Sequence, residues 1–334
     1  MKHCAICLTC GVELLIATRG SELAQWQAKA VLRELETKNQ VGSSELLITT
    51  TAGDRDVTSS LSEIGGKGVF VKEVQAAVLS GAADVAVHSA KDLPAQTPEG
   101  LTIGAVLKRG DPRDALVGCR LADLPAGATV ATGAPRRKAQ LAALRPDLCF
   151  VDLRGNIATR LAATSNCHAI VVAVAALNRL GLVEGSRVIE GSKVIDVLET
   201  EVFTPQVGQG VIAVECRSDD ETTKELLSTI EHSPTRICLE AERGFLQALG
   251  GDCNLPAGAY ATLEYASSGD LSSEYDETEA HKAEAHKPTL RLTAFLATPS
   301  SIRETITVSL LEAQTAATTG QNLAHSLLAK AASS

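Results

Sequence analysis

The sequence predicts an α/β protein made of two strand–helix domains followed by a small α+β domain. Strand-like and helix-like segments alternate from residue 12 to about residue 250, which favours a mostly parallel sheet in each of the first two domains. The run at 169–174 is apolar throughout, as expected of a strand buried on both faces. After Cys253, three strand-like segments follow one another along the chain, which indicates an antiparallel sheet.

Length and composition limit the class of protein. The chain has 334 residues, enough for two or three domains of roughly 100–150 residues each. Hydrophobic residues make up 45% and aromatic residues only 3%, so the cores must consist mostly of Ala, Val, Leu and Ile. The net charge of −9 argues against a general nucleic-acid binder, and the longest apolar run, at 169–177, is far shorter than a membrane span of ~20 residues. No signal peptide is evident, so we expect a cytoplasmic protein whose nine cysteines are mostly free thiols.

A strand at 12–18 opens the first domain, and Ser21 is of the residue type that caps a helix N-terminus. The helix that follows has an apolar face formed by Ala24, Ala28, Val31 and Leu35. The domain then continues with a strand at 46–51, a mobile glycine-rich loop at 58–68, a helix at 70–79 and a strand at 84–88.

The motif D-P-R-D at 111–114 breaks this pattern and starts the second domain. Pro135 suits the first turn of a helix, and another helix begins at Ile157. The expected strands of this domain are 129–132, 149–153 and 169–174. The chain turns again near 205–210, before a strand at 211–216 and helices at 221–230 and 235–248.

The last domain is expected to contain strands at 257–264, 290–296 and 302–309 and a helix at 321–331. Between its first two strands, residues 267–288 are rich in charge and contain no large aliphatic residue except Leu271. We expect a disordered or loosely helical hairpin tip there, because such a segment cannot bury enough apolar surface to fold.

The segment D-V-A-V-H-S-A-K-D-L-P at 84–94 joins a buried strand directly to charged residues. Ser89, Lys91 and Asp92 follow the strand, and Pro94 ends the cluster. Parallel α/β sheets bind their ligands at the carboxyl ends of strands. A solvated ion pair would be the simpler interpretation of one such cluster, but similar clusters recur along the chain and favour a binding site.

Basic residues follow several other predicted strands or end helices. They are Arg19, Arg136, Arg137, Arg154, Arg160 and Arg179. Each one alone would be interpreted as a surface salt-bridge partner. Together, in an acidic protein, they favour a shared cleft for carboxylates or phosphates. Small neighbours such as Gly133 and Gly155 would let backbone N–H groups approach the same ligand.

Cys253 lies in the glycine-rich segment L-G-G-D-C-N-L-P at 249–256, at a domain boundary. Two interpretations fit this position. One is a packed loop thiol, and the other is a nucleophilic or covalently modified thiol in an exposed loop.

Seven motifs stand in order along the chain. They are I-A-T-R-G-S at 16–21, G-G-K-G-V-F-V-K-E at 65–73, A-V-H-S-A-K-D-L-P at 86–94, D-P-R-D at 111–114, L-R-G-N-I-A-T-R at 153–160, V-G-Q-G at 207–210 and the Cys253 segment. In this order they resemble the porphobilinogen deaminase (hydroxymethylbilane synthase) family. The resemblance covers about residues 12–260 and is weaker in the last domain.

The resemblance implies two domains like type II periplasmic binding proteins around a cleft, plus the small third domain. The expected domains are 12–108 with 208–231, then 109–207, then 232–334, after an N-terminal extension at 1–11. Members of the family join four porphobilinogen molecules head to tail, release ammonia at each step and hydrolyse off a linear tetrapyrrole. They use a dipyrromethane cofactor, which here would be attached through a thioether to Cys253.

The resemblance also implies a role for each site residue. Asp92 would be the catalytic group, holding pyrrole N–H groups, stabilising developing positive charge and moving protons. Cys253 would be a tether for the cofactor, and Gln209 would lie at a hinge. The implied cofactor-binding residues are Cys253, Ser89, Lys91, Asp92, Thr132, Arg136, Arg137, Arg154 and Gly155. The implied substrate-binding residues are Arg19, Ser21, Lys67, Arg154, Arg160, Arg179 and Gln209.

The chain departs from the family pattern at two places. The Ser-Ser pair that usually precedes the double arginine is replaced by Gly133 and Ala134, so two hydroxyl donors are lost. Asp252 stands beside Cys253 where the family usually has glycine, and its charge would raise the pKa of the thiol.

Other interpretations remain open from the sequence. Cys4, Cys7 and Cys10 form a C-x-x-C-x-x-C pattern that could ligate a metal or an iron–sulfur cluster, although an extension without metal is the better interpretation. A carboxylate-binding protein of similar architecture and a nucleic-acid-associated regulator are the alternatives to an enzyme. We expect a monomer with no bound metal, no nucleic-acid partner and no membrane partner.

Overall fold

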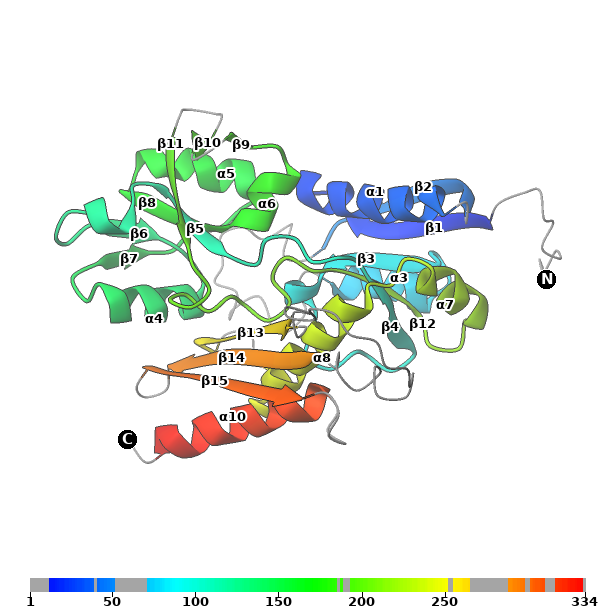
Figure 1. Cartoon of the computed structure of the whole chain (residues 1–334). Coiled ribbons are helices and arrows are strands. Elements are labelled where there is room, and N and C mark those ends of the chain that lie inside the picture. Colours follow the sequence, from blue (N-terminus) through cyan, green and yellow to red (C-terminus); the bar gives the residue numbers. More distant parts are fainter. Residues whose placement is uncertain are drawn as a thin grey trace, which may run out of the picture.

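The computed structural model describes residues 12–38, 41–51, 71–184, 187–188, 193–251, 255–264, 288–297, 301–309 and 316–332. These residues form three sheets with helices packed on them (Figure 1), so the predicted fold class is confirmed. The expectations for the loop at 58–68, for Lys67 and Cys253, for the N-terminal cysteines and for nearly all of 267–288 lie outside the described residues.

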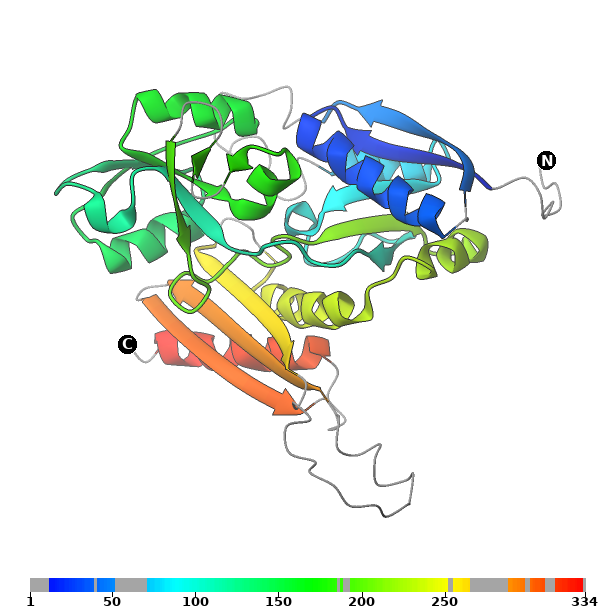
Figure 2. The same ribbon diagram turned by 45° about the horizontal axis from the view of Figure 1, so that its top comes forward.

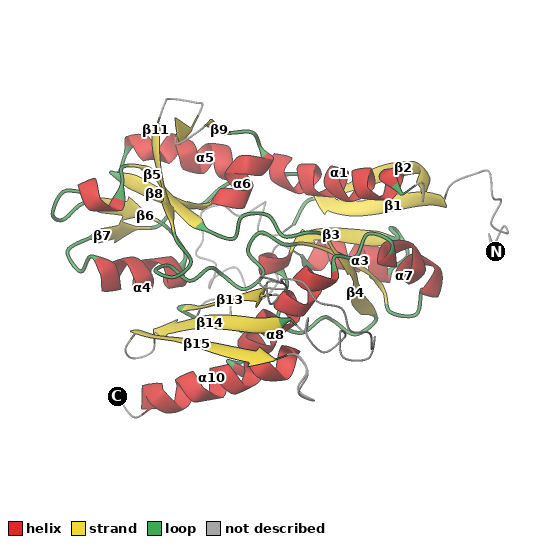
Figure 3. Cartoon of the chain, in the orientation of Figure 1, coloured by secondary structure: helices red, strands yellow, loops and turns green. Residues whose placement is uncertain are grey.

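The first domain is built on a sheet with strand order β2-β1-β3-β12-β4. Its strands are β1 (Val12–Arg19), β2 (Val41–Thr49), β3 (Val85–Ser89), β4 (Leu101–Val106) and β12 (Ile212–Arg217). The helices α1 (Glu22–Thr37), α3 (Lys72–Leu79) and α7 (Glu221–Ser228) pack against it (Figure 3). β4 is a strand that the sequence pattern did not single out.

Helix α1 forms where the cap and the apolar face predicted it. The Ser21 side chain accepts a hydrogen bond from the Ala24 N–H at 3.3 Å, which satisfies one of the free donors at the helix start. Ala28, Val31 and Leu35 are fully buried against the sheet. The local sequence and the tertiary packing therefore agree on this element.

The second domain is built on a sheet with strand order β7-β6-β8-β5-β11-β10-β9. Its strands are β5 (Asp114–Gly118), β6 (Thr129–Ala131), β7 (Cys149–Val151), β8 (Ala169–Ala173), β9 (Val183–Glu184), β10 (Arg187–Val188) and β11 (Lys193–Leu198). Its helices are α4 (Pro135–Leu144), α5 (Ile157–Ala162) and α6 (Val174–Arg179). Every residue of β8 is buried, as the apolar run predicted.

The expectation of mostly parallel sheets is wrong in two respects, one of which is local: β10 pairs antiparallel with its chain neighbours β9 and β11. β12 pairs antiparallel with both β3 and β4, and β5 pairs antiparallel with both β8 and β11. The reason is that the chain crosses between the domains twice, at 107–113 and at 199–211. Each crossing inserts one reversed strand into the middle of the sheet that it enters. Alternation of strands and helices cannot show this, because the partners of the inserted strands are distant in sequence.

The two crossing segments touch each other. The Gly110 N–H donates to the Gly210 carbonyl at 3.0 Å. Gly210 has a φ of +86°, and a side chain there would bring its Cβ to 2.7 Å from the Gly110 oxygen. Glycine is therefore required at position 210 for the crossing to close.

The third domain has the antiparallel order β13-β14-β15, as predicted, and Figure 2 shows its long strands beside α10. Its elements are α8 (Ser233–Ala248), β13 (Ala257–Glu264), β14 (Thr289–Ala297), β15 (Ser301–Ser309) and α10 (Ala316–Ala332). Gly244 and Gly320 allow α8 and α10 to approach closely, since a Cβ at either position would overlap the backbone of the facing helix. This packing extends α10 to Ala316, five residues before the predicted start at 321.

The third domain also contacts the second directly. Arg303 on β15 donates to the Glu201 carbonyl at 3.0 Å and to the Gln140 side chain at 2.9 Å, and it also donates to the Val202 carbonyl. The third domain is therefore anchored to the second crossing segment, at Glu201 and Val202.

Candidate functional site

The carboxyl ends of β1 and β3 form the first-domain half of the candidate site. The two strands are parallel neighbours, so the residues that follow them lie at the same edge of the sheet. The short turn η1 (Ala90–Asp92) continues directly from β3. A cavity of about 70 Å³ opens here, and its lining includes the predicted residues Arg19, Ser21, Ser89, Lys91 and Asp92.

Lys91, one of the residues that line this cavity, is half-buried. Its Nζ donates to the Gln209 Oε1 at 3.3 Å. Burial and the positive charge of Arg137 lower the pKa of Lys91 to about 8, while the carboxylates of Asp92 and Asp114 oppose the shift. The charge of this lysine therefore changes near pH 8.

Arg136 and Arg137, in the first turn of α4, form the second-domain half. They are only 3% and 6% exposed, and they share one carboxylate, that of the fully buried Asp114. Asp114 accepts from the Nη2 atom of each arginine at 2.6 Å. The other amino groups donate to backbone carbonyls, Arg136 to Thr204 and Arg137 to Val171.

This cluster carries more positive than negative charge. Burial alone would raise the pKa of Asp114, but the charges and hydrogen bonds of Arg136 and Arg137 outweigh burial and hold that pKa well below its usual range. One carboxylate thus faces two guanidinium groups. The Nε of Arg136 is buried and has no hydrogen-bond partner among the described residues. An additional anion or acceptor would therefore find both charge and a free donor here.

Gln209 joins the two halves. Its side chain is fully buried, and its amide nitrogen donates to the Asp114 carboxylate at 3.1 Å and to the Pro112 carbonyl at 2.7 Å. Its amide oxygen accepts from Lys91. The amide thus connects the lysine of the first domain to the arginine cluster of the second.

Arg154 and Arg160 come from the loop after β7 and from α5. The Nε of Arg160 donates to the Gly155 carbonyl at 2.8 Å, and Gly155 has a φ of +93°, which favours glycine. Burial and the charge of Arg137 lower the pKa of Arg160 to about 10, and Arg154 and Arg19 contribute to the decrease. Asp92 opposes it. Residues of both domains therefore act on one another electrostatically across the boundary.

Thr132 and Arg179 also lie near this boundary. Thr132 is 1% exposed, and its hydroxyl accepts from the Ala134 N–H at 3.3 Å. Ala134 caps α4 without any side-chain hydrogen bond. Arg179, at the end of α6, donates from Nη2 to the Gly210 carbonyl at 2.7 Å. Burial lowers the pKa of Arg179 to about 10.

Three residues at the site were not predicted. Asp114 belongs to the D-P-R-D motif, which the sequence analysis recognised without placing this residue at the site. Two adjacent arginines in one buried helix turn need a negative charge nearby, and this requirement is the signal that could have identified Asp114. Arg109 and Glu242 form an ion pair at 2.5 Å, and Glu242 also accepts from the Gly208 N–H at 2.7 Å. No sequence signal identifies this pair, because 133 positions separate its members.

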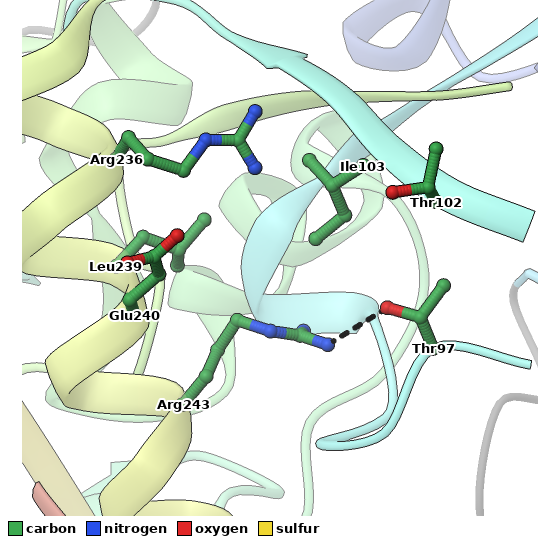
Figure 4. A pocket seen from close by; sticks show the side chains of 7 residues that line it. All are labelled: Thr97, Thr102, Ile103, Arg236, Leu239, Glu240 and Arg243. Carbon is green, nitrogen blue, oxygen red and sulfur yellow. Dashed lines mark hydrogen bonds between the residues drawn. The ribbon is translucent and has the colours of Figure 1, made fainter. Parts of the chain in front are cut away.

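A second cavity, of about 220 Å³, lies between α8 and β4, and none of the predicted site residues lines it (Figure 4). At its edge Arg243 donates to the Thr97 hydroxyl at 3.3 Å and to the Ala95 carbonyl at 2.9 Å. These bonds connect α8 to the loop that follows Asp92. They therefore hold α8 against the first domain, close in sequence to the predicted site residues Lys91 and Asp92.

Within the described ranges, no group of three or more His, Cys, Asp or Glu side chains could hold a metal ion. None of the helices described there is both long and apolar enough to cross a membrane.

Two family models match the chain. The model described as "Porphobilinogen deaminase, dipyromethane cofactor binding domain" covers residues 14–225, and "Porphobilinogen deaminase, C-terminal domain" covers 236–329. The porphobilinogen deaminase of Nitratidesulfovibrio vulgaris is 46% identical over 256 residues, which cover 75% of this chain and 78% of that protein. The porphobilinogen deaminase of Geobacter metallireducens is 38% identical over 327 residues, which cover 96% of this chain and 92% of that protein.

Similar solved structures include two binding proteins. The Methionine Binding Protein MetQ is 13% identical, with a TM-score of 0.38 over 65% of this chain and 89% of that chain. The periplasmic aliphatic sulphonate binding protein SsuA from Escherichia coli is 16% identical, with a TM-score of 0.36 over 65% of this chain and 67% of that chain. At these TM-scores the likeness supports no inference about a ligand.

Proposed function

Because the chain belongs to the porphobilinogen deaminase family, we propose that porphobilinogen reacts in the cavity at the ends of β1 and β3, with Asp92 as the catalytic group. The chain is an enzyme, a transferase of tetrapyrrole biosynthesis that uses a dipyrromethane cofactor. It joins four porphobilinogen molecules head to tail with loss of ammonia and releases a linear tetrapyrrole by hydrolysis. The observation that carries the site assignment is that five separately predicted residues line one cavity.

The residues near this cavity suit a cofactor that carries acetate and propionate groups. Two guanidinium groups share one carboxylate at Asp114, and Arg136 keeps a buried donor without a partner in the described chain. We assign cofactor binding to Ser89, Lys91, Asp92, Thr132, Arg136, Arg137, Arg154 and Gly155, with attachment through Cys253. The cofactor supplies the primer to which the first substrate is joined.

Asp92 is proposed to act on the substrate at each step. Its carboxylate accepts a hydrogen bond from the pyrrole N–H and stabilises the positive charge that develops as the aminomethyl C–N bond breaks and ammonia leaves. After the new C–C bond forms, the attacking ring carbon loses its proton, which Asp92 accepts and passes on to solvent or ammonia. One carboxylate beside Lys91 can serve both steps, because it returns to its charged form after each one.

The substrate carboxylates are proposed to bind Arg19, Ser21, Lys67, Arg154, Arg160 and Arg179, with Gln209 at the hinge. Guanidinium groups suit this task because they bind carboxylates through two parallel hydrogen bonds. The charges of Arg19 and Arg154 both act to lower the pKa of Arg160, which supports a common position around the substrate.

The Asp92→Asn variant tests the catalytic assignment. We expect it to fold and to retain the cofactor mass, while kcat falls by about 10²–10⁴-fold because the proton acceptor is lost. Asp123→Asn, which removes an exposed carboxylate from η2 (Leu121–Asp123), is the matched control and should leave kcat unchanged. An Asp92→Asn protein with the control's kcat would contradict the assignment.

Intact mass tests the attachment through Cys253. We expect the purified protein to be heavier than the polypeptide by two pyrrole units, and Cys253→Ala to have the bare polypeptide mass. Cys149→Ala, which removes an exposed cysteine of the second domain, should keep the added mass. Added mass on Cys253→Ala would show that another residue carries the cofactor.

We further propose that 12–108 with 208–231, 109–207 and 232–334 are the functional domains, and that the enzyme is a cytoplasmic monomer without nucleic-acid or membrane partners. The three separate sheets support the division into domains, and the net charge of −9 argues against a nucleic-acid partner. Light scattering on the eluting protein should give the mass of one chain, whereas a dimer mass would contradict it.

A further inference from the structure

Trp26, the only tryptophan of the chain, lies between two arginines. It is on α1, half-buried, and its ring packs on the core of the first domain. The Cζ of Arg33 lies 5.4 Å from the ring centroid, and the Cζ of Arg179 lies 5.8 Å from it. Both distances are within the range of a cation–π interaction.

The two arginines come from different parts of the molecule. Arg33 is two helical turns along α1 from Trp26, so this contact stays within the first domain. Arg179 ends α6 of the second domain, and Figure 1 shows α6 beside the start of α1. The contact between Trp26 and Arg179 therefore spans the boundary between the domains.

Arg179 is held on a second side by the crossing segments. The Gly210 carbonyl accepts from the Arg179 Nη2 at 2.7 Å and from the Gly110 N–H at 3.0 Å. One guanidinium group thus meets the indole ring of the first domain and the crossing between the domains. A shift of one domain against the other must change at least one of these contacts.

The charge of Arg179 remains available to a ligand. Within the described chain, its only hydrogen bond goes to the Gly210 carbonyl, and no carboxylate pairs with it. This contrasts with Arg136 and Arg137, which are both paired with Asp114. A ring that contacts a guanidinium by its face leaves the N–H donors at the edge free to bind a carboxylate.

We propose that Trp26 is a positioning residue for the reaction: its indole ring holds the Arg179 guanidinium at the domain boundary, ready to bind a carboxylate of porphobilinogen or of the growing pyrrole chain. This inference rests on the proposed function, in which Arg179 binds substrate carboxylates. Trp26 itself does not touch the substrate. Its effect is to keep one binding group in place, so it acts on substrate affinity more than on the chemical step.

Steady-state kinetics of the holoenzyme test this role. Loss of the ring in Trp26→Leu should raise KM for porphobilinogen by about fivefold and leave kcat within about twofold, since a cation–π contact of this kind has a modest energy. Trp26→Phe keeps an aromatic face and should restore most of the affinity. Arg33→Gln removes the contact inside the first domain only, and it is the matched control with unchanged KM.

The Arg179→Gln variant separates this inference from the proposed function. We expect it to raise KM at least as much as Trp26→Leu, and the double variant to be no worse than Arg179→Gln alone. If Arg179→Gln raises KM but Trp26→Leu does not, the role of Trp26 is wrong and the proposed substrate role of Arg179 stands. If Arg179→Gln leaves KM unchanged, that substrate role fails, and this inference fails with it.

Fluorescence gives a readout that a purely structural role would not alter. Because Trp26 is the only indole, its emission reports on this boundary alone. Porphobilinogen should change the emission of the wild-type and Arg33→Gln enzymes, and this change should be largely lost in Arg179→Gln. An equal change in Arg179→Gln would mean that the ring does not sense this arginine, which would overturn the proposal.

Discussion

The first two domains share one strand order but hold their charged residues in different ways. β2-β1-β3-β12-β4 in the first domain corresponds to β7-β6-β8-β5-β11 in the second, with one reversed strand inserted at the same place in each. In the first domain, Lys91 and Asp92 are half-buried around a cavity. In the second, Arg136 and Arg137 are buried and paired with Asp114. The charged side chains of the first domain thus remain able to contact a ligand in the cavity. In the second domain, the ion pairs with Asp114 hold Arg136 and Arg137 in place, and the cluster keeps a net positive charge.

The difference arises at the crossings. Asp114 is the first residue of the reversed strand β5 and enters the second sheet directly beneath the two arginines. The corresponding strand of the first domain, β12, begins at Ile212 and brings no acid to Lys91. Instead, Gln209 just before it contributes a neutral amide, which contacts both Lys91 and Asp114. The lesson is that a shared topology fixes where strands lie, while the residues at the end of each crossing, Asp114 in one case and Gln209 in the other, decide the charge of the site.

Among the variants that test this difference between the domains, Asp114→Asn should have the largest effect on stability. It leaves two buried guanidinium groups without a counter-charge, so we expect a loss of about 3–5 kcal/mol in the free energy of unfolding. Denaturant titration measures this loss. Asp123→Asn, in an exposed turn of the same domain, should change stability by less than about 0.5 kcal/mol. Equal effects of the two substitutions would mean that the buried cluster is not what stabilises the second domain.

Gln209→Leu should have the next largest effect, because it removes the link between the two halves. The substitution leaves Lys91 and the Pro112 carbonyl without their partner, at a cost of about 1–3 kcal/mol. Gln206→Leu is the matched control, since the single side-chain hydrogen bond of this half-buried amide to a described residue goes to the Lys91 carbonyl. We expect KM for porphobilinogen to rise in Gln209→Leu more than in Gln206→Leu, as measured by initial rates.

Lys91, assigned above to the cofactor, also lines the cavity in which the substrate is proposed to react, so its charge should make substrate binding depend on pH. Its pKa in the folded protein is about 8, below the usual 10.5, so the positive charge is present below pH 8 and is lost as the pH rises through that value. KM should therefore rise above pH 8 by about fivefold, the loss of one charged hydrogen bond. In Lys91→Arg the charge persists, and the KM profile should be flat over the same range.

The lowered pKa of Lys91 also predicts how the free energy of unfolding changes with pH. Between pH 8 and 10.5 the unfolded chain keeps the Lys91 proton that the folded chain has lost. The free energy of unfolding should therefore rise with pH in this window relative to Lys91→Met, which has no such proton. A relative decrease measured by denaturant titration at these pH values would contradict the assigned shift.

The smallest predicted effect concerns the N-terminal caps of α1 and α4. The Ser21 side chain caps α1 in the first domain, whereas Ala134, the N-cap residue of α4 in the second, makes no side-chain cap hydrogen bond. Ala134→Ser should stabilise the protein by about 0.5–1 kcal/mol by bonding a free N–H of α4. Gly133→Ser should not, because its Cβ would lie 3.1 Å from the Leu153 carbonyl oxygen. Thermal unfolding of the two variants compares them directly.

Several features were predictable from sequence because they depend on a few neighbouring residues. The cap at Ser21, the buried strand β8 and the polar end of β3 follow from residue type and spacing over one or two turns. The positions of Arg19, Ser89 and Asp92 also followed, since each lies at or just beyond the carboxyl end of a strand that the apolar pattern predicts. The family, and with it the chemistry, was predictable because its motifs are short and local.

The remaining features were decided only by the tertiary structure. The direction of β5 and β12, the pairing of Arg136 and Arg137 with Asp114 and the contact of Trp26 with Arg179 all join residues that the chain brings together by crossing twice between domains. Spacing and propensity act over a few residues and contain no information on such contacts. The sequence alone thus determined which residues stand at strand ends and what chemistry they can perform. Which of them are neutralised in the interior and which stay free for a substrate was decided by burial and charge pairing, which exist only once the domains are closed against each other.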